Sequence, residues 1–170
     1  GRLGQVADAR KRAAAAREAR RTTRPTSSIV ENPVTARLIE IKELIDARDY
    51  VRAGAELKKL RAANPNEPRV HYNIGRVASL SAESITDEEK QKAALLEAKT
   101  AYESVIKTAT QNTDKALLSL TYVALAKIYE FYNEKTYAVA IYDKAIQLGP
   151  VSGGAHGEAI AAKARLIKEQ

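Results

Sequence analysis

One stretch, residues 116–150, constrains the fold more than any other part of the chain, because it carries two helical stripes in succession. Residues spaced three, one and three apart lie on one side of a helix, and this spacing joins Tyr122, Leu125, Ala126 and Tyr129. A second stripe, spaced four and three, joins Ala138, Tyr142 and Ala145. Since bulky and small residues alternate, the two helices can approach closely. The stretch therefore predicts a helical hairpin.

The end of this hairpin also has a local signal. Gly149 suits a left-handed position just after a helix, and Pro150 cannot continue a helix because it lacks the backbone N–H. We therefore expect the second helix to stop beside Leu148.

The same residues resemble a tetratricopeptide repeat, whose pattern is a bulky residue, a large–small pair, an aromatic residue, a later Ala, an aromatic residue four on, another Ala and a terminal Pro. Those positions are filled by Tyr122, Leu125, Ala126, Tyr129, Ala138, Tyr142, Ala145 and Pro150. The chain departs from this pattern at two positions. Ala126 replaces the usual Gly, and the aromatic Tyr137 lies directly before Ala138 instead of a few residues earlier. The resemblance implies a scaffold that binds peptides or proteins and rarely catalyses a reaction.

Two further hairpins are predicted before this one. In the hairpin at 34–65, the helical stripes are Leu38, Ile41, Leu44 and Ile45, and then Tyr50, Ala53, Leu57 and Leu60. Its first helix fits the repeat poorly, because Arg37 and Glu40 fall in bulky positions, so we interpret it as a degenerate terminal repeat.

The hairpin at 68–110 matches the repeat better. Its two stripes are His71, Ile74, Gly75 and Ala78, and then Leu95, Ala98, Tyr102 and Val105. The connection between them is longer than the family's short turn. The capping box Thr86-Asp87-Glu88-Glu89 predicts that the second helix starts near Asp87 and is long, and Asn112 or Thr113 is expected to cap the next helix.

A last helix is expected over residues 155–169. Ile160, Ala164 and Ile167 form its apolar side, and Lys163, Arg165, Lys168 and Glu169 lie largely on the other. By the resemblance, it is a capping helix that covers the last repeat.

Composition excludes several classes of protein. The 170 residues contain no Cys, which rules out disulfides, thiolate nucleophiles and thiolate metal sites. The longest apolar runs are shorter than the roughly 20 residues that a transmembrane helix needs, and no secretory signal is visible. The chain begins at Gly1 and contains no Met, which indicates a processed or truncated product. The cellular compartment and the source stay open.

The net charge of +7 belongs almost entirely to the start of the chain. Residues 1–24 hold eight basic and two acidic residues, whereas the other 146 hold 20 and 19. Ala and Arg favour a helix over residues 5–21, but only Leu3 and Val6 are apolar and larger than Ala, so we expect an exposed or partner-bound arm. Its candidate contact residues are Arg10, Lys11, Arg12, Arg17, Arg20 and Arg21.

The arm has several interpretations. It could bind an acidic protein, RNA or an anionic membrane, although it has no aromatic residue to stack on bases. It could equally be a charged spacer, and it also resembles an organellar transit peptide, which is normally removed. Thr, Ser and Pro residues then predict a linker over residues 22–33.

A search for catalytic or metal chemistry gives little. His71 and His156 fall on separate predicted helices, and His71 occupies a packing position. The acids at Asp87, Glu88 and Glu89 are explained by the dipole at a helix start. The nucleotide-binding and nucleophile motifs rich in glycine are absent, and Gly153-Gly154 lacks a following Lys. We predict no catalytic residue, no metal site and no cofactor.

The resemblance places the partner groove on the first helices of successive hairpins. The residues that would face it are Arg69, Tyr72, Asn73 and Arg76 in one hairpin, and Val123, Lys127 and Phe131 in the next. The first four offer two guanidinium groups, an amide and a phenol on one helix face, which suits a segment carrying carboxylates. Alternatively, the two arginines only pair with nearby acids. Of the carboxylate-binding set of chaperone-binding members, only Asn73 could be matched, because Leu38, Leu120 and Ala124 occupy the other positions.

The sequence thus predicts an all-α protein: a basic arm and linker at 1–33, then a tetratricopeptide-like solenoid at 34–170 with hairpins at about 34–65, 68–110 and 114–150 and a capping helix at 155–169. The predicted function is a protein-interaction scaffold in a larger complex, with the arm docking on an acidic partner. Nucleic-acid binding through the arm is the alternative, and an enzyme is the third class considered.

Overall fold

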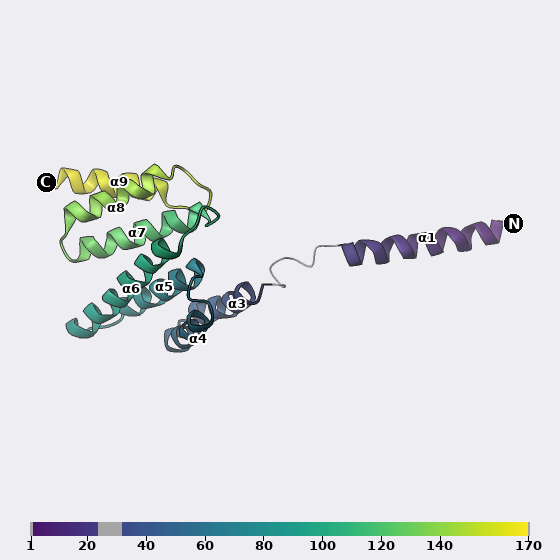
Figure 1. Ribbon diagram of the computed structural model, residues 1–170, viewed down its shortest axis with the longest axis horizontal. Coiled ribbons are helices and arrows are strands. Elements are labelled where there is room, and N and C mark those ends of the chain that lie inside the picture. The colour runs from purple at the N-terminus through teal and green to yellow at the C-terminus, as the bar shows by residue number, and fades with distance from the viewer. Residues whose placement is uncertain (1, 24–31, 170) are drawn as a thin grey trace. The chain divides into compact units, whose positions relative to one another are not determined.

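The computed structural model describes residues 2–23 and 32–169, and over these ranges it is all-α (Figure 1). Eight helices and no strand are found in the described ranges, which confirms that part of the prediction that assigned an all-α structure. By its internal contacts the chain divides into two compact units, Gly1–Glu40 and Ile41–Gln170.

The first unit contains the basic arm. Helix α1 (Arg2–Thr23) confirms the predicted helix and extends beyond both of its expected ends. Its described side chains, residues 2–16, are all exposed. Of the predicted linker, residues 24–31 lie outside the described part. Asn32 and Pro33 belong to the start of α3 (Pro33–Asp46), where the Asn32 Oδ1 accepts a hydrogen bond from the Val34 N–H at 3.0 Å.

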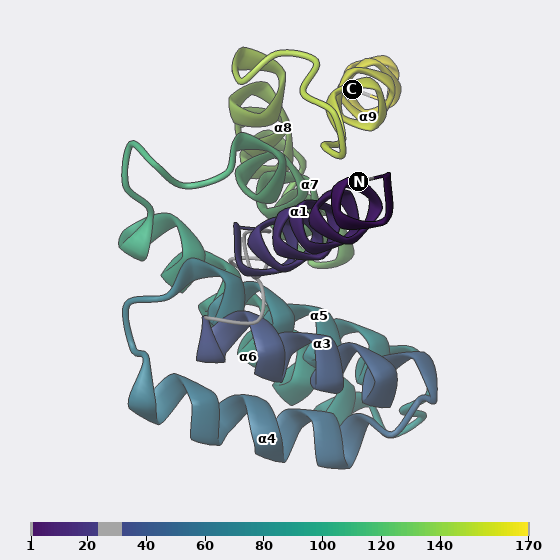
Figure 2. The ribbon, with the colours of Figure 1, turned by 90° about the vertical axis from the view of Figure 1, so that its right-hand side faces the viewer.

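The second unit holds the remaining helices in a consecutive packing order. These are α4 (Tyr50–Ala63), α5 (Pro68–Glu83), α6 (Glu88–Thr108), α7 (Lys115–Phe131), α8 (Lys135–Gln147) and α9 (His156–Lys168). Each helix from α4 onward packs against the next one along the chain (Figure 2), and α7, α8 and α9 lie side by side (Figure 1). In addition, α5 touches α7, and α7 touches α9.

Left-handed residues shape the turns between these helices. Arg48 (φ 59°) lies between α3 and α4, and Asn133 (φ 58°) lies between α7 and α8. Gly149 follows α8 with φ 80°, which confirms the left-handed position predicted from the sequence. Its N–H donates to the Ile146 carbonyl oxygen at 3.0 Å, so the end of α8 is closed by the backbone itself.

Two helix starts differ from their predicted caps. Helix α6 begins where expected, but its cap is Asp87, whose Oδ1 accepts from the Lys90 N–H at 2.9 Å, and not Thr86. Helix α7 is capped by Asp114, whose Oδ1 accepts from the Ala116 N–H at 3.0 Å. The predicted caps Asn112 and Thr113 belong instead to the preceding turn, because the Thr113 hydroxyl accepts from the Thr110 N–H at 2.8 Å.

Two neighbouring core clusters lie in the second unit, and further buried residues of α3, α4 and α5, such as Ile41, Leu57 and Val70, lie outside both. One cluster lies among α7, α8 and α9 and contains the fully buried Tyr142 and Leu166. The other lies among α5, α6 and α7 and contains Tyr102, Leu125 and Ile128. Helix α7 contributes to both clusters, so it links them.

Glu130 joins three helices beside the first cluster. Its Oε2 accepts a hydrogen bond from the Tyr142 hydroxyl of α8, and its Oε1 accepts from the Arg165 guanidinium of α9 at 2.7 Å. Burial and the hydrogen bond to this carboxylate raise the pKa of Tyr142 well above its usual value.

The predicted orientation of α9 is wrong. Its buried residues are Ala159 and Leu166, whereas Ile160 and Ile167 are 46% and 51% exposed and Ala164 is exposed. Ala159 and Leu166 lie seven residues apart, on the same side of the helix, and they pack on α7 and α8. Helix α9 is therefore apolar on two sides. The side with Ala159 and Leu166 contacts α7 and α8.

Among the described residues, no helix is both long enough and apolar enough to cross a membrane.

Candidate functional site

The predicted α5 contact residues share one side of that helix, and all four are half-buried. Arg69 pairs with Glu67 in the preceding loop, with its Nε 2.7 Å from the Glu67 Oε1. The Asn73 side-chain amide donates to the Arg69 carbonyl oxygen at 2.8 Å. This ion pair agrees with the alternative interpretation from the sequence, in which Arg69 pairs with a nearby acid.

Gly75 determines what lies behind this side of α5. A Cβ placed on Gly75 would lie 2.6 Å from the Tyr102 ring, closer than carbon atoms can approach. With no side chain there, the ring of Tyr102 lies against α5, and Tyr72 packs on it with ring centroids 6.0 Å apart. Burial raises the pKa of Tyr102 to about 12.

Arg76 differs from Arg69 in its surroundings. It is half-buried, and its charge acts on both Tyr72 and Tyr102, lowering pKa values that burial raises. Within the described ranges, no carboxylate lies at ion-pair distance from Arg76. Its guanidinium group therefore keeps its donors available beside two phenol rings.

The α7 half of the predicted site needs one correction. Val123 is 3% exposed and belongs to the core cluster with Ala126 and Tyr142, so it cannot contact a partner. It shares its side of α7 with Ser119, whose hydroxyl accepts from the Ala155 N–H at 2.9 Å, and this side faces α8 and α9. The predicted register placed Val123 one residue away from the accessible side.

Lys127 and Phe131 are both exposed, as the prediction requires. Lys127 forms an ion pair with Glu158 of α9, and Phe131 contacts the Tyr132 ring edge to face at 5.3 Å between centroids. Ala124, one turn before Lys127, packs on the same cluster as Tyr72. We call the set Arg69, Tyr72, Asn73, Arg76, Lys127 and Phe131 the α5–α7 face.

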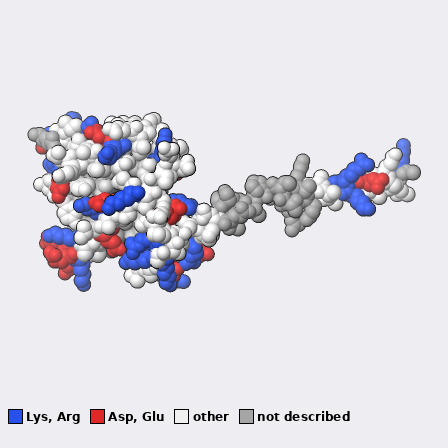
Figure 3. Space-filling view, in the orientation of Figure 1, with Lys and Arg blue, Asp and Glu red and all other residues white. Residues whose placement is uncertain are grey.

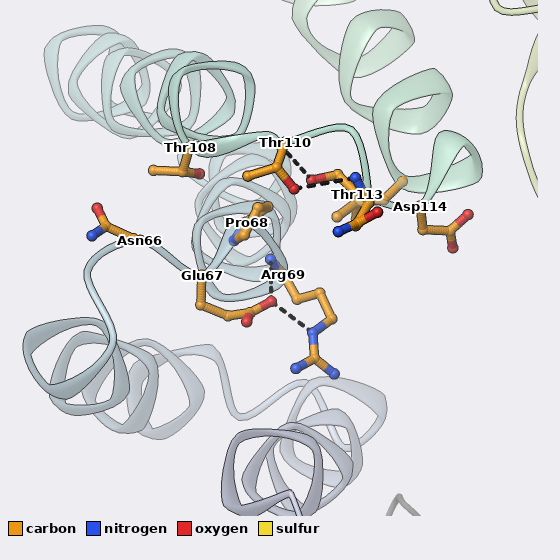
Figure 4. Close-up of a pocket in the computed structure, with 10 residues that line it drawn as sticks. Asn66, Glu67, Pro68, Arg69, Thr108, Thr110, Thr113 and Asp114 are labelled. Atoms are coloured by element: carbon orange, nitrogen blue, oxygen red, sulfur yellow. Dashed lines mark hydrogen bonds and ion pairs between the residues drawn. The ribbon is translucent and has the colours of Figure 1, made fainter.

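A hollow of about 410 Å³ opens where α5 and α7 begin (Figure 4). Its lining combines the α4–α5 loop, the end of α6 and the α6–α7 loop: Asn66, Glu67, Pro68, Arg69, Thr108, Thr110, Asn112, Thr113, Asp114 and Leu117. Figure 4 shows the Arg69 side chain lying along Glu67. The hollow offers hydroxyl, amide and carboxylate groups next to one end of the α5–α7 face.

Several residues of this region were not predicted as site residues. The hydroxyl oxygens of Tyr102 and Ser79 lie 3.5 Å apart, and the Tyr102 ring packs on Tyr72. The pair Ile74-Gly75 was the available signal, because a glycine inside a helix indicates close approach of another group. No comparable signal marks Thr108 or Thr110.

The arm residues Arg10, Lys11 and Arg12 are exposed on α1, whereas the side chains of Arg17, Arg20 and Arg21 lie outside the described part of the chain. Figure 3 shows Lys and Arg gathered on the described part of the arm, with one acidic patch, while both signs are mixed on the visible face of the second unit.

The residues that could perform metal or acid–base chemistry do not converge in the described parts of the chain. No group of three His, Asp or Glu side chains is placed there to hold a metal ion. His71 is buried, and its Nε2 donates to the Pro65 carbonyl oxygen at 2.7 Å. This contact gives His71 a structural role at the α4–α5 loop.

Comparisons with protein-family models, with curated proteins and with solved structures found no match to this chain.

Proposed function

We propose that this protein is an interaction scaffold built from tetratricopeptide-like helical hairpins, and that a partner segment binds on its α5–α7 face. The consecutive packing of α4 to α9, with additional contacts from α5 to α7 and from α7 to α9, supports a solenoid of this kind. In this proposal α9 is the capping helix, and the protein works as a subunit of a larger complex without a cofactor or a catalytic step.

The surroundings of the Arg76 side chain are the observation that supports this proposal most directly. A half-buried guanidinium group is usually paired, because a desolvated charge is costly. Within the described residues Arg76 has phenol rings but no carboxylate beside it. A partner carboxylate would complete this environment, and the exposed Phe131 would provide an apolar contact.

The arm adds a second contact in this proposal. Exposed Arg10, Lys11 and Arg12 attract an acidic surface of the same partner or of a neighbouring subunit, and this attraction weakens with salt. The alternative function, binding of RNA or DNA phosphates through the arm, is favoured by the concentration of basic residues there. Phosphate binding would fall steeply with salt, and an apolar contact on the α5–α7 face would not.

The test is a pull-down from extract of the native source with the full chain and two matched variants. Arg76→Ala should lose the partner about tenfold or more, since a charged pair in an interface contributes about 2 kcal/mol or more. Lys144→Ala, which removes an exposed basic residue of α8, should retain it. Equal recovery with both variants would exclude the α5–α7 face as the binding surface.

A further inference from the structure

A second surface lies between α4 and α6, away from the residues of the α5–α7 face. Both helices pack on α5, but they touch each other little. Two hollows of about 360 and 380 Å³ open between them and share Ile74 of α5 and Glu97 of α6. We call this surface the α4–α6 groove.

Small side chains keep the groove open. Its α4 wall contains Gly54 and Ala55, and its α6 wall contains Ala93 and Ala94. A Cβ placed on Gly54 would meet nothing closer than Val77, at 3.9 Å. The space between the helices is therefore not filled by the protein's own side chains.

The groove is largely apolar. Ile74, Val77 and Ala78 of the core helix α5 form its floor. On its walls, Val51 is 88% exposed and Leu96 is 58% exposed. Exposed apolar side chains that gather around a concavity mark interaction surfaces, because burying them in a partner is favourable.

The two hollows follow the direction of α4. One is lined by α4 residues between Tyr50 and Lys58, and the other reaches Arg61 near the end of that helix. At 1.5 Å per residue, the centres of these α4 segments lie about 10 Å apart. Residues i and i+7 of a helix have the same separation, so a helix lying in the groove could place one apolar side chain in each hollow.

The charged residues of the groove indicate which kind of helix it would bind. Of the four basic residues of helix α4, Lys58 and Arg61 line the hollows, and α6 contributes the acid Glu97 to both. Arg61 lines a hollow, and within the described ranges it has no ion-pair partner. Lys58 reaches across the groove to Glu97 at 3.3 Å, but both side chains are about half exposed, so this pair contributes little and can rearrange.

We propose that the α4–α6 groove binds an acidic amphipathic helix of a partner protein, with apolar residues seven apart in the two hollows and a carboxylate paired with Arg61. Lys58 and Arg61 disfavour a basic occupant such as the arm, whose helix also lacks an apolar face. This site is independent of the proposed carboxylate contact at Arg76.

The test is a binding titration of the full chain with two synthetic, dye-labelled helical peptides. Both carry leucines at positions i, i+3 and i+7; one has glutamates on its flanks and the other has lysines. The glutamate peptide should bind at least tenfold more tightly in fluorescence anisotropy, and its affinity should fall as salt rises.

Variants locate the peptide. Ala93→Trp fills the groove from an exposed position and should weaken binding of the glutamate peptide about tenfold or more, whereas Ala140→Trp on α8 should not change it. Arg61→Glu should also weaken binding about tenfold, whereas Lys144→Glu on α8 should have a smaller effect. Circular dichroism of each variant confirms that its helices are retained.

Three results would overturn the inference: no saturable binding of the glutamate peptide, equal binding of the lysine peptide, or unchanged binding to Ala93→Trp. Arg76→Ala should bind the glutamate peptide as the parent chain does, so the result also separates this groove from the α5–α7 face.

Discussion

Gly75 sets how closely Tyr102 can lie against α5. Replacing a helical glycine with alanine normally stabilises a protein by about 0.5–1 kcal/mol. Here the added Cβ would lie 2.6 Å from the Tyr102 ring, so Gly75→Ala must displace a buried aromatic ring. We expect it to destabilise the protein by about 1–3 kcal/mol in urea unfolding.

The matched control is Gly54→Ala in α4. The nearest atom to its Cβ would be the Val77 Cγ1, at an ordinary contact distance of 3.9 Å. Gly54→Ala should therefore stabilise the protein by about 0.5–1 kcal/mol. If both substitutions change stability in the same direction, packing of Tyr102 against Gly75 is not what distinguishes the two sites.

The raised pKa of Tyr102 leads us to expect that stability depends on pH. Its pKa is raised by burial to about 12, whereas an unfolded tyrosine titrates near pH 10. Between these two pH values the unfolded state loses a proton that the folded state keeps. The free energy of unfolding should therefore fall by up to about 3 kcal/mol as pH rises from 10 to 12.

The measurement is chemical unfolding at several alkaline pH values, for the parent chain and for Tyr102→Phe. The variant should show a shallower decline over this range, because it removes the shifted group and leaves Tyr142. An identical decline in both proteins would mean that Tyr102 does not remain protonated in the folded state.

At the level of single elements, α9 has two apolar sides, and only one is used. Leu166 is 1% exposed, and Ile167 is 51% exposed, although the two are neighbours in the sequence. Leu166→Ala should cost about 2–5 kcal/mol, because it leaves a cavity among α7, α8 and α9. Ile167→Ala should change stability by about 0.5 kcal/mol or less.

Thermal unfolding of the two variants checks this difference. A larger loss for Ile167→Ala than for Leu166→Ala would restore the orientation of α9 that the sequence pattern predicted.

The positions of the helices along the chain were easier to predict than the side that each helix buries. Gly149 and Asp87 mark helix boundaries through local backbone chemistry, which a sequence contains directly. The side of α9 depends on which neighbour it meets, and Ile160, Ala164 and Ile167 form as regular a stripe as the buried residues do. Val123 was misplaced for the same reason, since one residue of register turns a helix by about 100°.

The candidate site was predictable in part. The positions of Arg69, Tyr72, Asn73 and Arg76 on one half-buried side of α5 follow from helical spacing alone. Arg69 is paired because Glu67, in the adjacent loop, lies close enough to contact it. Helical spacing alone could not predict this contact. The α4–α6 groove was missed, although Gly54-Ala55 and Ala93-Ala94 were visible as small residues on two helices.

Across the whole molecule, we propose different tasks for the two compact units. The arm carries nearly all of the net charge and no broad apolar face. The second unit has a packed core, mixed surface charge and two candidate contact surfaces. Because a charged arm and a helical surface respond differently to truncation and to salt, their contributions can be separated in one experiment.

That experiment is a pull-down from native extract with the full chain beside a chain starting at Ser27, each with and without nuclease and followed by mass spectrometry. We expect both chains to retain the same protein partner. Nuclease should not release it, and the shorter chain should bind it more weakly at low salt. Loss of all partners from the shorter chain, together with their release from the full chain by nuclease, would contradict the scaffold function and assign the protein's role to nucleic-acid binding by the arm.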